Sequence, residues 1–442
     1  MLSIETIREN ADEVQQAADR KGIRLSVKEL LASDEKRRAL IGETESLRAE
    51  RNAISEQIAA IAQGGNVPVG DPANDFLWAK EEAKRINDSL KQAEARLAEA
   101  LRRYGKLMLL VPNLVSPDTP EGSSDADNVE IRRVGAPRKA DFPLLDHVAL
   151  GELHGMLDLA RGVKAAGTRN YYLKGTGVRL HRAVQQLALD LLAAKGFETL
   201  EVPLMVRPET LEQTGFFPLG EDQTFRIEAE RKCLIGTSEV PLVAYYANEI
   251  VDVSKPIRHA AASMCFRSEV GSTGKDVRGL YRVHQFAKVE QVVLCEADPA
   301  LSERLLHEIT ANAEELLAML ELPYRVVAVC AGDMSQKTYK QYDIETWMPS
   351  REAYGETHSS SNLRDFQARR SNIRYRDAEG NLRYCHTLNN TAVASPRILI
   401  PLLENHQAED GSIRVPEALR PYLGGIDRLV PPSPSPFGQR IR

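Results

Sequence analysis

The sequence predicts a mixed α/β (α+β) fold in which a long helical hairpin precedes a larger domain of helices and strands. Three observations support this prediction. Two heptad series of apolar residues follow one another near the N-terminus, a segment rich in glycine and proline separates them, and both helical and strand patterns occur later in the chain. The chain has 442 residues, and a domain typically has about 100 to 200, so two or three domains are expected.

The two heptad series define the hairpin. Apolar residues recur seven apart at Leu40, Leu47, Ile54 and Ile61, and a second series combines Ala83, Leu90, Leu97 and Tyr104 with Ile86, Ala93, Ala100 and Leu107. Residues 64–72 lie between them and contain glycines and prolines that cannot sustain a helix, so the chain can reverse there. We expect arms of about 30 to 40 residues, which make a rod of about 45 to 60 Å at 1.5 Å per residue.

Basic residues follow one another along the second arm. They are Lys84, Arg85, Lys91, Arg96, Arg102, Arg103 and Lys106. This pattern is typical of a solvated coiled-coil face, but it also suits contact with nucleic acid or with a partner helix. The pattern alone leaves all three interpretations open.

A connection rich in Pro, Ser and Asp at residues 112–127 indicates a domain boundary. We therefore expect three regions, residues 1–110, 111–425 and a disordered tail at 426–442. Within the second region, the apolar spacing predicts helices and strands. The helices are Leu180–Ala194, Ala300–Leu320 and Pro396–Glu404, and the strands are Thr199–Val206 with a break at Pro203, Tyr324–Cys330 and Arg374–Arg376.

Composition narrows the function class. Hydrophobic residues make up 43% of the chain and charged residues 27%, which is typical of a globular protein. No apolar run reaches the ~20 residues of a membrane span and no secretory signal pattern begins the chain, so we expect a cytoplasmic protein without membrane contact. The five cysteines form no C-x-x-C pair and the nine histidines no H-E-x-x-H cluster, so we expect reduced thiols and no zinc site.

One segment combines residue types that packing does not explain. Phe266–Glu269 precedes a loop at Val270–Gly279, and Arg282–Glu290 follows it. We expect two strands around this loop. Guanidinium groups bind phosphate and carboxylate, an aromatic ring stacks on a base, and carboxylates bind an amine. The segment therefore suits a site for a nucleotide and an amino acid.

This arrangement resembles motif 2 of the class II aminoacyl-tRNA synthetases, and it is most similar to that of the seryl family. Three further segments carry the resemblance, which extends from residue 1 to about 425. They are Thr237-Ser238-Glu239, Glu356-Thr357-His358-Ser359, and His386 to Thr391 leading to Arg397. The resemblance implies an antiparallel sheet flanked by helices, and an enzyme that joins serine to ATP and then transfers serine to the 3′ end of tRNA.

The resemblance implies that three arginines are the catalytic residues. Arg267 would hold the α-phosphate and the serine carboxylate, and Arg282 and Arg397 would bracket the β- and γ-phosphates. The attack of a carboxylate on phosphorus creates a crowded, highly negative centre. Positioning and cations should therefore provide most of the catalysis, without a protein nucleophile.

Other residues would complete the ATP site. Glu269 would orient the adenine and ribose end, Phe286 would stack on adenine, and Glu356 with Ser359 would bind ATP, the carboxylate through Mg2+. The implied ATP-binding set is Arg267, Ser268, Glu269, Arg282, Val283, Phe286, Glu356, Thr357, His358, Ser359 and Arg397.

Serine recognition is implied at a second group of residues. Thr237 and Glu239 would bind the α-amino group, and Glu290 with Thr391 would bind the hydroxyl. The implied serine-binding set is Thr237, Ser238, Glu239, Arg267, Glu290, Asn389 and Thr391. A site built around a substrate hydroxyl rejects the analogue that lacks it by about 10⁴ to 10⁵.

The resemblance also implies partners. The helix that ends near Gly196 and the following strand resemble motif 1, which builds a homodimer, and the hairpin would bind tRNA(Ser), and tRNA(Sec) where it exists. Gly355 and Ser361 depart from the basic residue and the cysteine common in the family, and Ala392 to Pro396 replace the glycine-rich pattern general to the class. The open alternatives are an enzyme that loads a carrier protein, a regulatory protein that has lost its chemistry, and a threonine or proline enzyme.

Overall fold

The computed structural model describes residues 1–62, 72–271, 276 and 278–432, which divide into two compact units. One unit comprises residues 3–18 and 24–111, and the other residues 1–2, 19–23 and 112–442. Residues 64–71 of the expected reversal (64–72) and residues 433–442 of the expected tail (426–442) lie outside the described residues, and Pro72 begins a helix. The expectation of disorder is wrong for Arg428–Leu429, which form a strand paired with Ile413–Arg414. Among the described residues, no helix is both long and apolar enough to span a membrane.

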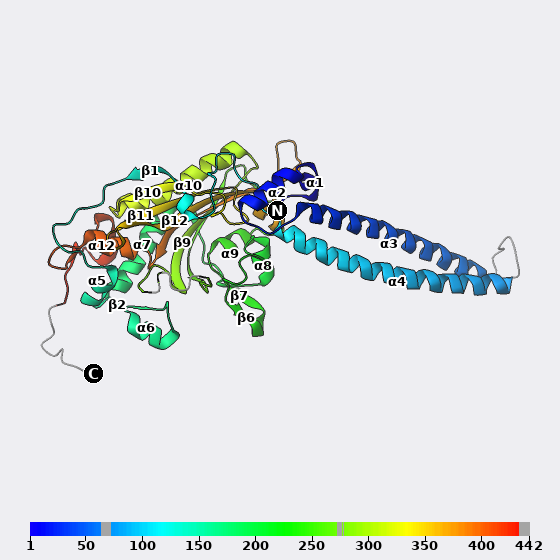
Figure 1. Ribbon diagram of the computed structural model, residues 1–442, viewed down its shortest axis with the longest axis horizontal. Coiled ribbons are helices and arrows are strands. Elements are labelled where there is room, and N and C mark those ends of the chain that lie inside the picture. The colour runs from blue at the N-terminus through cyan, green and yellow to red at the C-terminus, as the bar shows by residue number, and fades with distance from the viewer. Residues whose placement is uncertain (63–71, 272–275, 277, 433–442) are drawn as a thin grey trace. The chain divides into compact units, whose positions relative to one another are not determined.

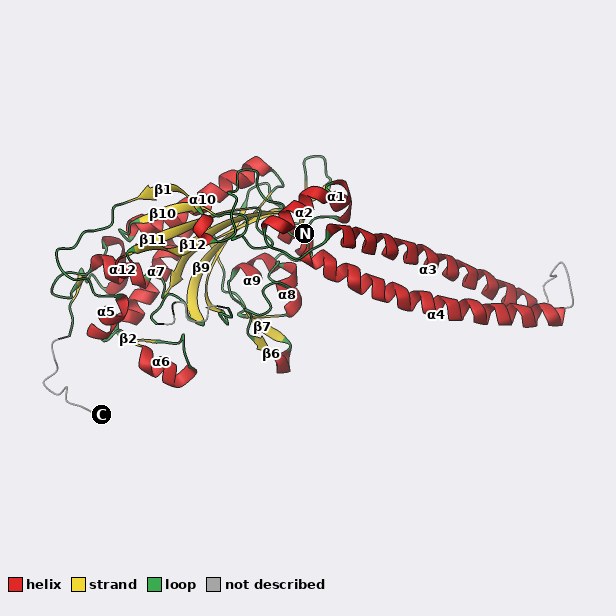
Figure 2. Ribbon diagram, in the orientation of Figure 1, coloured by secondary structure: helices red, strands yellow, loops and turns green. Residues whose placement is uncertain are grey.

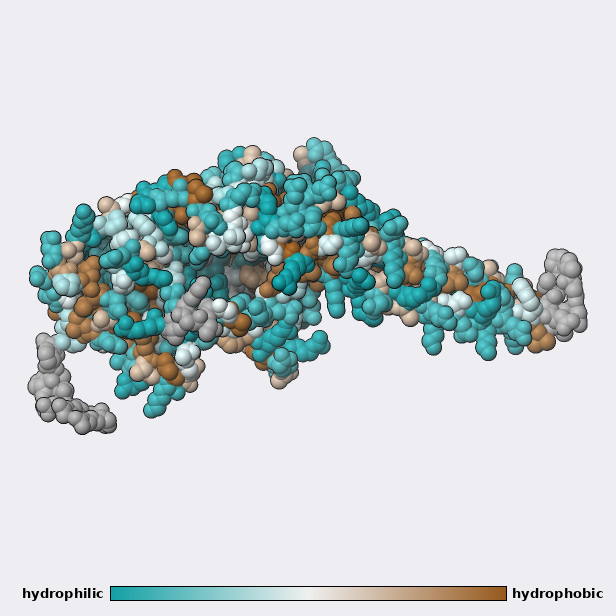
Figure 3. All heavy atoms as spheres, in the orientation of Figure 1, coloured by the Kyte–Doolittle hydropathy of each residue, from teal (hydrophilic) through white to brown (hydrophobic). Residues whose placement is uncertain are grey.

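The N-terminal unit is the predicted helical hairpin. After the short helices α1 (Ile4–Glu9) and α2 (Ala11–Arg20), the 36-residue α3 (Val27–Ala62) packs along the 39-residue α4 (Pro72–Leu110) (Figure 1). The predicted seam residues are buried or half-buried, and Ile54 and Ile86 are both 5% exposed. Hydrophilic side chains cover the outer faces of both helices (Figure 3). The heptads thus identified both arms and the faces that meet.

Ion pairs link the two arms of the hairpin across their exposed edges. Arg96 lies 2.5 Å from Glu43, and Arg103 lies 2.8 Å from Glu29. Arg85 and Arg102 pair with glutamates three residues earlier on α4. Exposed pairs of this kind contribute only about 0 to 1 kcal/mol each, so the apolar seam supplies most of the stability.

The second unit contains an eight-stranded sheet in the order β1-β10-β11-β12-β15-β9-β8-β4 (Figure 2). All neighbouring strands are antiparallel except the parallel pair β4 and β8. In sheet order, the strands span Val129–Val134, Tyr324–Ala328, Lys340–Met348, Ala353–Arg364, His386–Ser395, Gln285–Cys295, Ile257–Phe266 and Glu198–Thr199. The antiparallel sheet implied by the resemblance is therefore confirmed.

Helices cover both faces of the central strands. The helices α7 (Thr176–Ala194) and α10 (Pro299–Met319) pack against one face, where the main core includes Val289 and Val293 of β9. On the opposite face α9 (Glu239–Ala244) packs on β9 and α11 (Phe366–Ser371) packs on β15. The short α9 and α11 cover only part of that face, which leaves room for a cleft beside them.

The remaining elements complete this unit. The helices are α5 (His147–Leu153), α6 (Leu159–Ala166), α8 (Pro208–Gln213) and α12 (Leu399–His406). The small sheets pair β2 (Leu157–Asp158) with β3 (Tyr172–Leu173), β7 (Lys232–Leu234) with β5 (Met205–Val206) and β6 (Arg226–Ile227), β13 (Arg374–Arg376) with β14 (Leu382–Tyr384), and β16 (Ile413–Arg414) with β17 (Arg428–Leu429).

The predicted strand near Pro203 and the predicted helix after β15 differ from the observed elements in ways that proline and a turn explain. The strand expected at Thr199–Val206 is two short strands, β4 and β5, which belong to different sheets. Pro203 lies between them and has no N–H to offer to a ladder, which agrees with the break expected there. The helix expected from Pro396 begins at Leu399, because the preceding residues form a turn after β15.

Candidate active site

Strand β9 supplies the floor of the cleft because its side chains alternate between the two faces of the sheet. Val289 and Val293 enter the main core, whereas Val292 contributes to the smaller apolar cluster on the other face. Phe286, Lys288 and Glu290 have the same parity as Val292. The face therefore changes along one strand from an apolar core to an aromatic and charged surface.

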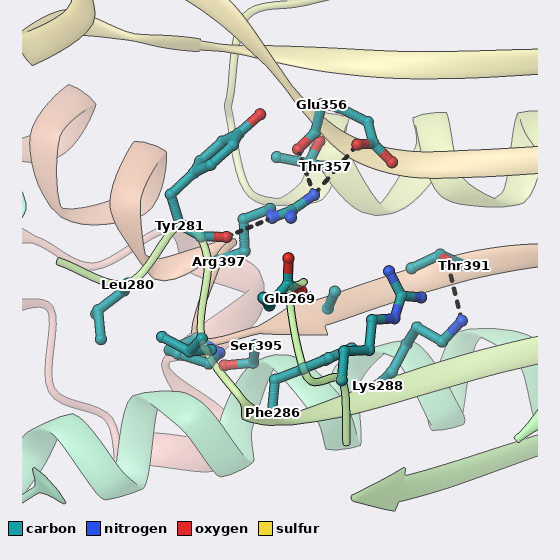
Figure 4. Close-up of a pocket in the computed structure, with 14 residues that line it drawn as sticks. Glu269, Leu280, Tyr281, Phe286, Lys288, Glu356, Thr357, Thr391, Ser395 and Arg397 are labelled. Atoms are coloured by element: carbon teal, nitrogen blue, oxygen red, sulfur yellow. Dashed lines mark hydrogen bonds and ion pairs between the residues drawn. The ribbon is translucent and has the colours of Figure 1, made fainter. Parts of the chain in front are cut away.

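A cleft opens over this surface (Figure 4). Residues from β9, β12, β15 and the motif 2 segment surround it. They are Arg267, Glu269, Leu280, Tyr281, Val283, Phe286, Lys288, Glu356, Thr357, Thr391, Ala394, Ser395, Pro396 and Arg397. The structure thus brings together eight residues of the implied ATP and serine sets from four separate chain segments.

Arg267 and Phe286 form one side of the cleft. The guanidinium carbon of Arg267 lies 5.3 Å from the centroid of the Phe286 ring, and its Nε donates to the carbonyl of Gly236 at 3.3 Å. Gly236 directly precedes Thr237, so Arg267 links the floor to the segment implied in serine binding. Its side chain is exposed, and a guanidinium carries five N–H donors.

Arg282 lies outside the cleft lining but contacts it through Glu269. Its Nη1 lies 3.2 Å from Glu269 Oε2, and its Nε lies 4.0 Å from Asp276. Glu269 follows the end of β8 and has a φ of +53°, a backbone conformation uncommon for residues other than glycine. β8 ends at Phe266, so the strand expected to include Glu269 is shorter, and the turn at Glu269 presents its carboxylate to Arg282.

Arg397 is held at the opposite wall by contacts with Tyr281 and Glu356. Its Nε donates to the carbonyl of Tyr281 at 3.0 Å, and its Nη1 donates to the backbone oxygen of Glu356 at 3.1 Å (Figure 4). The guanidinium carbon also lies 4.5 Å from the centroid of the Tyr281 ring, and Arg351 lies 4.3 Å from the same ring. Two cations thus share one aromatic side chain at the rim of the cleft.

Lys288, Glu290 and Thr391 form a buried polar group at the inner end. Glu290 is 1% exposed, with Oε2 lying 2.6 Å from Lys288 Nζ and 3.3 Å from the Thr391 hydroxyl that donates to it. Burial raises the pKa of Glu290, Lys288 opposes this shift, and the nearby Glu239 adds to it. The residues implied to bind the serine hydroxyl therefore contact each other.

Glu239, the first residue of α9, lies near this group. Its Oε1 is 2.5 Å from Lys337 Nζ and accepts from Gln367 Nε2 at 2.7 Å. Thr237 is buried, and its hydroxyl accepts from the Glu239 amide at 3.2 Å. Ser238 is also buried and donates to the carbonyl of Ala261 at 3.4 Å, on β8.

A bulge in β12 determines which side chains between Glu356 and Ser359 point into the cleft. The pairing with β11 shifts between Ile344 and Glu345, so Thr357 is an extra residue and lines the cleft beside Glu356. His358 is buried, with Nδ1 2.8 Å from the Thr357 hydroxyl, and burial lowers its pKa to about 3. Ser359 accepts from Gln341 at 3.1 Å.

Three other residues of the implied sets lie close to the cleft or in its wall. Val283 lines the cleft and is buried, whereas Ser268 donates its hydroxyl to the carbonyl of Asp222 at 2.6 Å. Asn389 is 8% exposed and lies two residues before Thr391 on β15, on the same face of the sheet. Gly355 lies under the cleft wall, where an added Cβ would be 3.1 Å from Tyr281 Cε2.

Sequence reasoning gave no role to Lys288, Tyr281 or Lys337. Lys288 could have been found, because it lies two residues before Glu290 on the same strand face. Tyr281 directly precedes Arg282, but its place between Arg351 and Arg397 depends on three distant segments. Lys337 lies in a loop almost a hundred residues from Glu239, and no sequence pattern connects them.

The cleft offers one exposed carboxylate, Glu356, for a divalent cation. Within the described ranges, no group of three or more His, Cys, Asp or Glu residues could hold a metal ion by itself. Mg2+ usually binds through one or two carboxylates together with substrate phosphates and water. A single carboxylate beside Arg397 therefore fits a cation that arrives with a triphosphate.

Two family models match the chain. The model for the N-terminal domain of seryl-tRNA synthetases matches residues 1–115, and that for the class II tRNA synthetase core domain (G, H, P, S and T) matches residues 224–406. The serine–tRNA ligase of Deinococcus radiodurans is 45% identical over 98% of this chain and 100% of its own length.

Solved structures agree with these matches. The seryl-tRNA synthetase from Pyrococcus horikoshii complexed with ATP is 37% identical with a TM-score of 0.87, over 98% of this chain and all of that one. The cytoplasmic serine–tRNA ligase of Naegleria fowleri, in complex with AMP, is 29% identical with a TM-score of 0.83 and covers 98% of this chain and 99% of its own.

Proposed function

The chain belongs to the seryl-tRNA synthetase family and is an ATP-dependent serine–tRNA ligase, and we propose that the cleft over β9 and β15 binds its ATP and serine. The enzyme joins serine to ATP, which gives seryl-adenylate and pyrophosphate. A ribose hydroxyl of the 3′-terminal adenosine of tRNA(Ser) then attacks the seryl carbonyl, an ester bond forms, and the bond to the phosphate breaks with release of AMP. The observation that supports this location most strongly is the alignment of Phe286, Lys288 and Glu290 on one strand face, next to Thr391.

The aromatic and arginine side of the cleft would hold ATP. The face of Phe286 would stack on adenine, with Arg267 above it and Val283 in the wall. Glu269 would orient the adenine and ribose end. Arg282, Ser268, Thr357 and His358 support the surrounding backbone and side chains through the contacts described above.

Arginines on two sides of the cleft would stabilise the first step. The serine carboxylate attacks the α-phosphorus, a carboxylate oxygen–phosphorus bond forms, and the bond to pyrophosphate breaks. Arg267 would neutralise charge on the α-phosphate and align the carboxylate, while Arg282 and Arg397 would bind the departing pyrophosphate. Fixed cations in a cleft that excludes much water stabilise such developing charge effectively.

Serine would lie over the inner polar group. Its hydroxyl would contact Glu290 and Thr391, its α-ammonium would contact Glu239 and Thr237, and Ser238 and Asn389 would complete the wall. A substrate that lacks the hydroxyl, such as alanine, would not form the hydrogen bonds to the buried Glu290 and Thr391. Each buried group left without a hydrogen-bond partner lowers the binding free energy by about 1 to 3 kcal/mol. This arrangement favours serine over alanine.

We assign Mg2+ to Glu356, with Ser359 nearby on the same strand. When bound with ATP, Mg2+ would neutralise phosphate charge. Glu356 has a second role in this chain, because its backbone oxygen and carboxylate both contact Arg397 Nη1, at 3.1 and 3.4 Å. Glu356 would thereby place Arg397 and the cation on the same phosphate groups.

We also propose that the region from residue 1 to 110 binds tRNA through the hairpin. Its rigid rod and basic residues suit contact with the phosphate backbone of a folded RNA, tRNA(Ser) and, where it exists, tRNA(Sec). Four of the seven basic residues are ion-paired with glutamates, and Lys84, Lys91 and Lys106 have no ion pair among the described residues. These three lysines are the first candidates for phosphate contact.

Two further assignments accompany this function. A homodimer would form along α7 and the strand after it, β4; on α7, Val178 is an exposed apolar side chain, 40% accessible. The enzyme would act in the cytoplasm. The catalytic region would begin at residue 111 and would include β17, which pairs with β16.

Binding of a non-hydrolysable seryl-adenylate analogue tests the assigned cleft. Calorimetry of the full chain should give tight binding that weakens about 10²-fold in Arg267→Ala and in Glu290→Ala, because each loses contacts to charged or polar groups. Arg304→Ala, an exposed arginine on α10, serves as the control and should bind like the wild type. Equal affinity in all four proteins would move the site away from this cleft.

A further inference from the structure

Lys337 lies behind the wall of the cleft rather than in its lining. It belongs to the loop between β10 and β11, is 7% exposed, and places Nζ 2.5 Å from Glu239 Oε1. Gln367 on α11 donates to the same oxygen at 2.7 Å. Two donors from separate elements therefore fix one oxygen of a carboxylate that is itself 4% exposed.

Burial removes the Lys337 ammonium from water, which is energetically unfavourable for a charged group. Desolvation lowers the pKa of Lys337, while Glu239 and Glu290 act against that shift and Lys288 adds to it. The ring of Phe216, whose centroid lies 3.7 Å from Nζ, also contacts the ammonium. Replacing both members of a buried ion pair by apolar side chains is often neutral or stabilising, whereas removing only one member is strongly destabilising. The buried lysine therefore has to be explained together with Glu239, the acid that it contacts.

The inner end of the cleft contains two carboxylates, each with its own lysine. Lys288 pairs with Glu290 at 2.6 Å, and Lys337 pairs with Glu239. Burial raises the pKa of Glu290, Lys288 opposes this shift, and Glu239 adds to it. Without Lys337, Gln367 alone would hold Glu239 Oε1, and one lysine would remain beside two buried acids.

We propose that Lys337 is a positioning residue for serine, which holds Glu239 in one orientation so that Oε2 accepts the α-ammonium. This inference rests on the proposed function of Glu239. Lys337 does not touch the substrate in this arrangement, since it acts through the carboxylate. Gln367 assists in orientation but carries no charge.

The pyrophosphate-exchange kinetics of Lys337→Met test this role. The variant should raise the KM for serine about 10- to 100-fold, the range expected when a hydrogen bond to a charged group is lost, and leave the KM for ATP within about threefold. Lys340→Met is the matched control, because Lys340 is also buried but pairs with Asp118 and Glu303 outside the cleft. It should leave the KM for serine unchanged.

A mutant cycle separates positioning from general damage. Lys337→Arg keeps the charge and should recover part of the affinity for serine. In a Glu239→Gln background, Lys337→Met should add little further loss, because its target carboxylate is already gone. Thermal unfolding and ATP affinity show whether each variant is folded. If Lys337→Met does not fold, the comparison of Lys337→Arg in the wild-type and Glu239→Gln backgrounds carries the test.

Failure of this inference differs from failure of the proposed function. A wild-type enzyme without serine-dependent exchange would refute the function. A fully active wild type with an unchanged serine KM in Lys337→Met, or equal losses from Lys337→Met with and without Glu239, would overturn the positioning role alone.

Discussion

Glu290 on β9 and Thr391 on β15 lie directly opposite each other, and the Thr391 hydroxyl donates to Glu290 Oε2 at 3.3 Å. Lys288 contacts the same oxygen at 2.6 Å. One carboxylate oxygen is therefore held by two neighbours, which leaves Oε1 for an incoming hydroxyl. Opposed residues on adjacent strands are positioned by the backbone ladder, so this pair requires no loop to close over it.

Glu290→Ala should damage the use of serine more than the use of ATP. We expect the KM for serine to rise about 10²-fold, because a charge-assisted hydrogen bond is lost, while the KM for ATP changes little. Discrimination against alanine should fall in parallel. Exchange kinetics with serine and alanine measure these effects. The control is Glu308→Ala, which removes an acid of α10 that pairs with Arg258 of β8. An unchanged preference for serine would exclude Glu290 from hydroxyl recognition.

Phe286→Ala should weaken ATP binding. Loss of the stacking face should cost about 1 to 3 kcal/mol, or about 5- to 150-fold in the KM for ATP. Phe286→Tyr keeps the aromatic face and should stay near the wild-type value. If the alanine and tyrosine variants have the same KM for ATP, adenine does not stack on this ring.

Deletion of residues 30–107 removes most of the hairpin and should separate the two half-reactions. Serine-dependent pyrophosphate exchange should persist, since the cleft lies wholly in the other compact unit. Charging of tRNA(Ser) should fall by about 10² or more, because several phosphate contacts are lost. Normal charging by the shortened protein would refute the assigned role of the arm.

Stability should fall as the solution is acidified from about pH 6.5 to pH 4. Burial lowers the pKa of His386 to about 4, and its ordinary value is 6.5, so in this window the unfolded chain binds a proton that the folded chain does not. Above pH 6.5 His386 is neutral in both states and does not lower the free energy of unfolding. Between about pH 6.5 and pH 4, its titration in the unfolded chain lowers that free energy by up to about 1.4 kcal/mol per pH unit.

Thermal unfolding of His386→Gln across this pH range measures that contribution. The midpoint of the variant should fall less steeply with acidification than that of the wild type. Equal slopes in both proteins would show that His386 is not the group concerned.

Local patterns predicted part of this structure well. The heptads at Leu40 to Ile61 and Ala83 to Leu107 identified the buried seam, because a coiled coil depends on contacts that repeat along the sequence. The motif 2 pattern also placed Phe286 and Glu290 correctly on one strand face, because the alternation of side chains between the two faces of a strand depends only on neighbouring residues. The antiparallel order of the sheet came from family resemblance, because strand pairing is non-local.

Contacts between distant segments could not be predicted. Lys337 meets Glu239 only because the loop after β10 folds against α9, and Arg397 meets Tyr281 because the turn after β15 returns to motif 2. The bulge at Thr357 also depends on pairing with β11. Such features follow from packing of the whole sheet and have no signature in one stretch of sequence.

Amino-acid-dependent exchange of labelled pyrophosphate into ATP, without tRNA, tests the central claim most directly. The full chain is assayed in parallel with serine, threonine, alanine and glycine. We predict rapid exchange with serine and rates lower by several orders of magnitude with alanine, because Glu290 and Thr391 require a hydroxyl. Exchange that is equal for serine and alanine, or absent with every amino acid, would contradict the account.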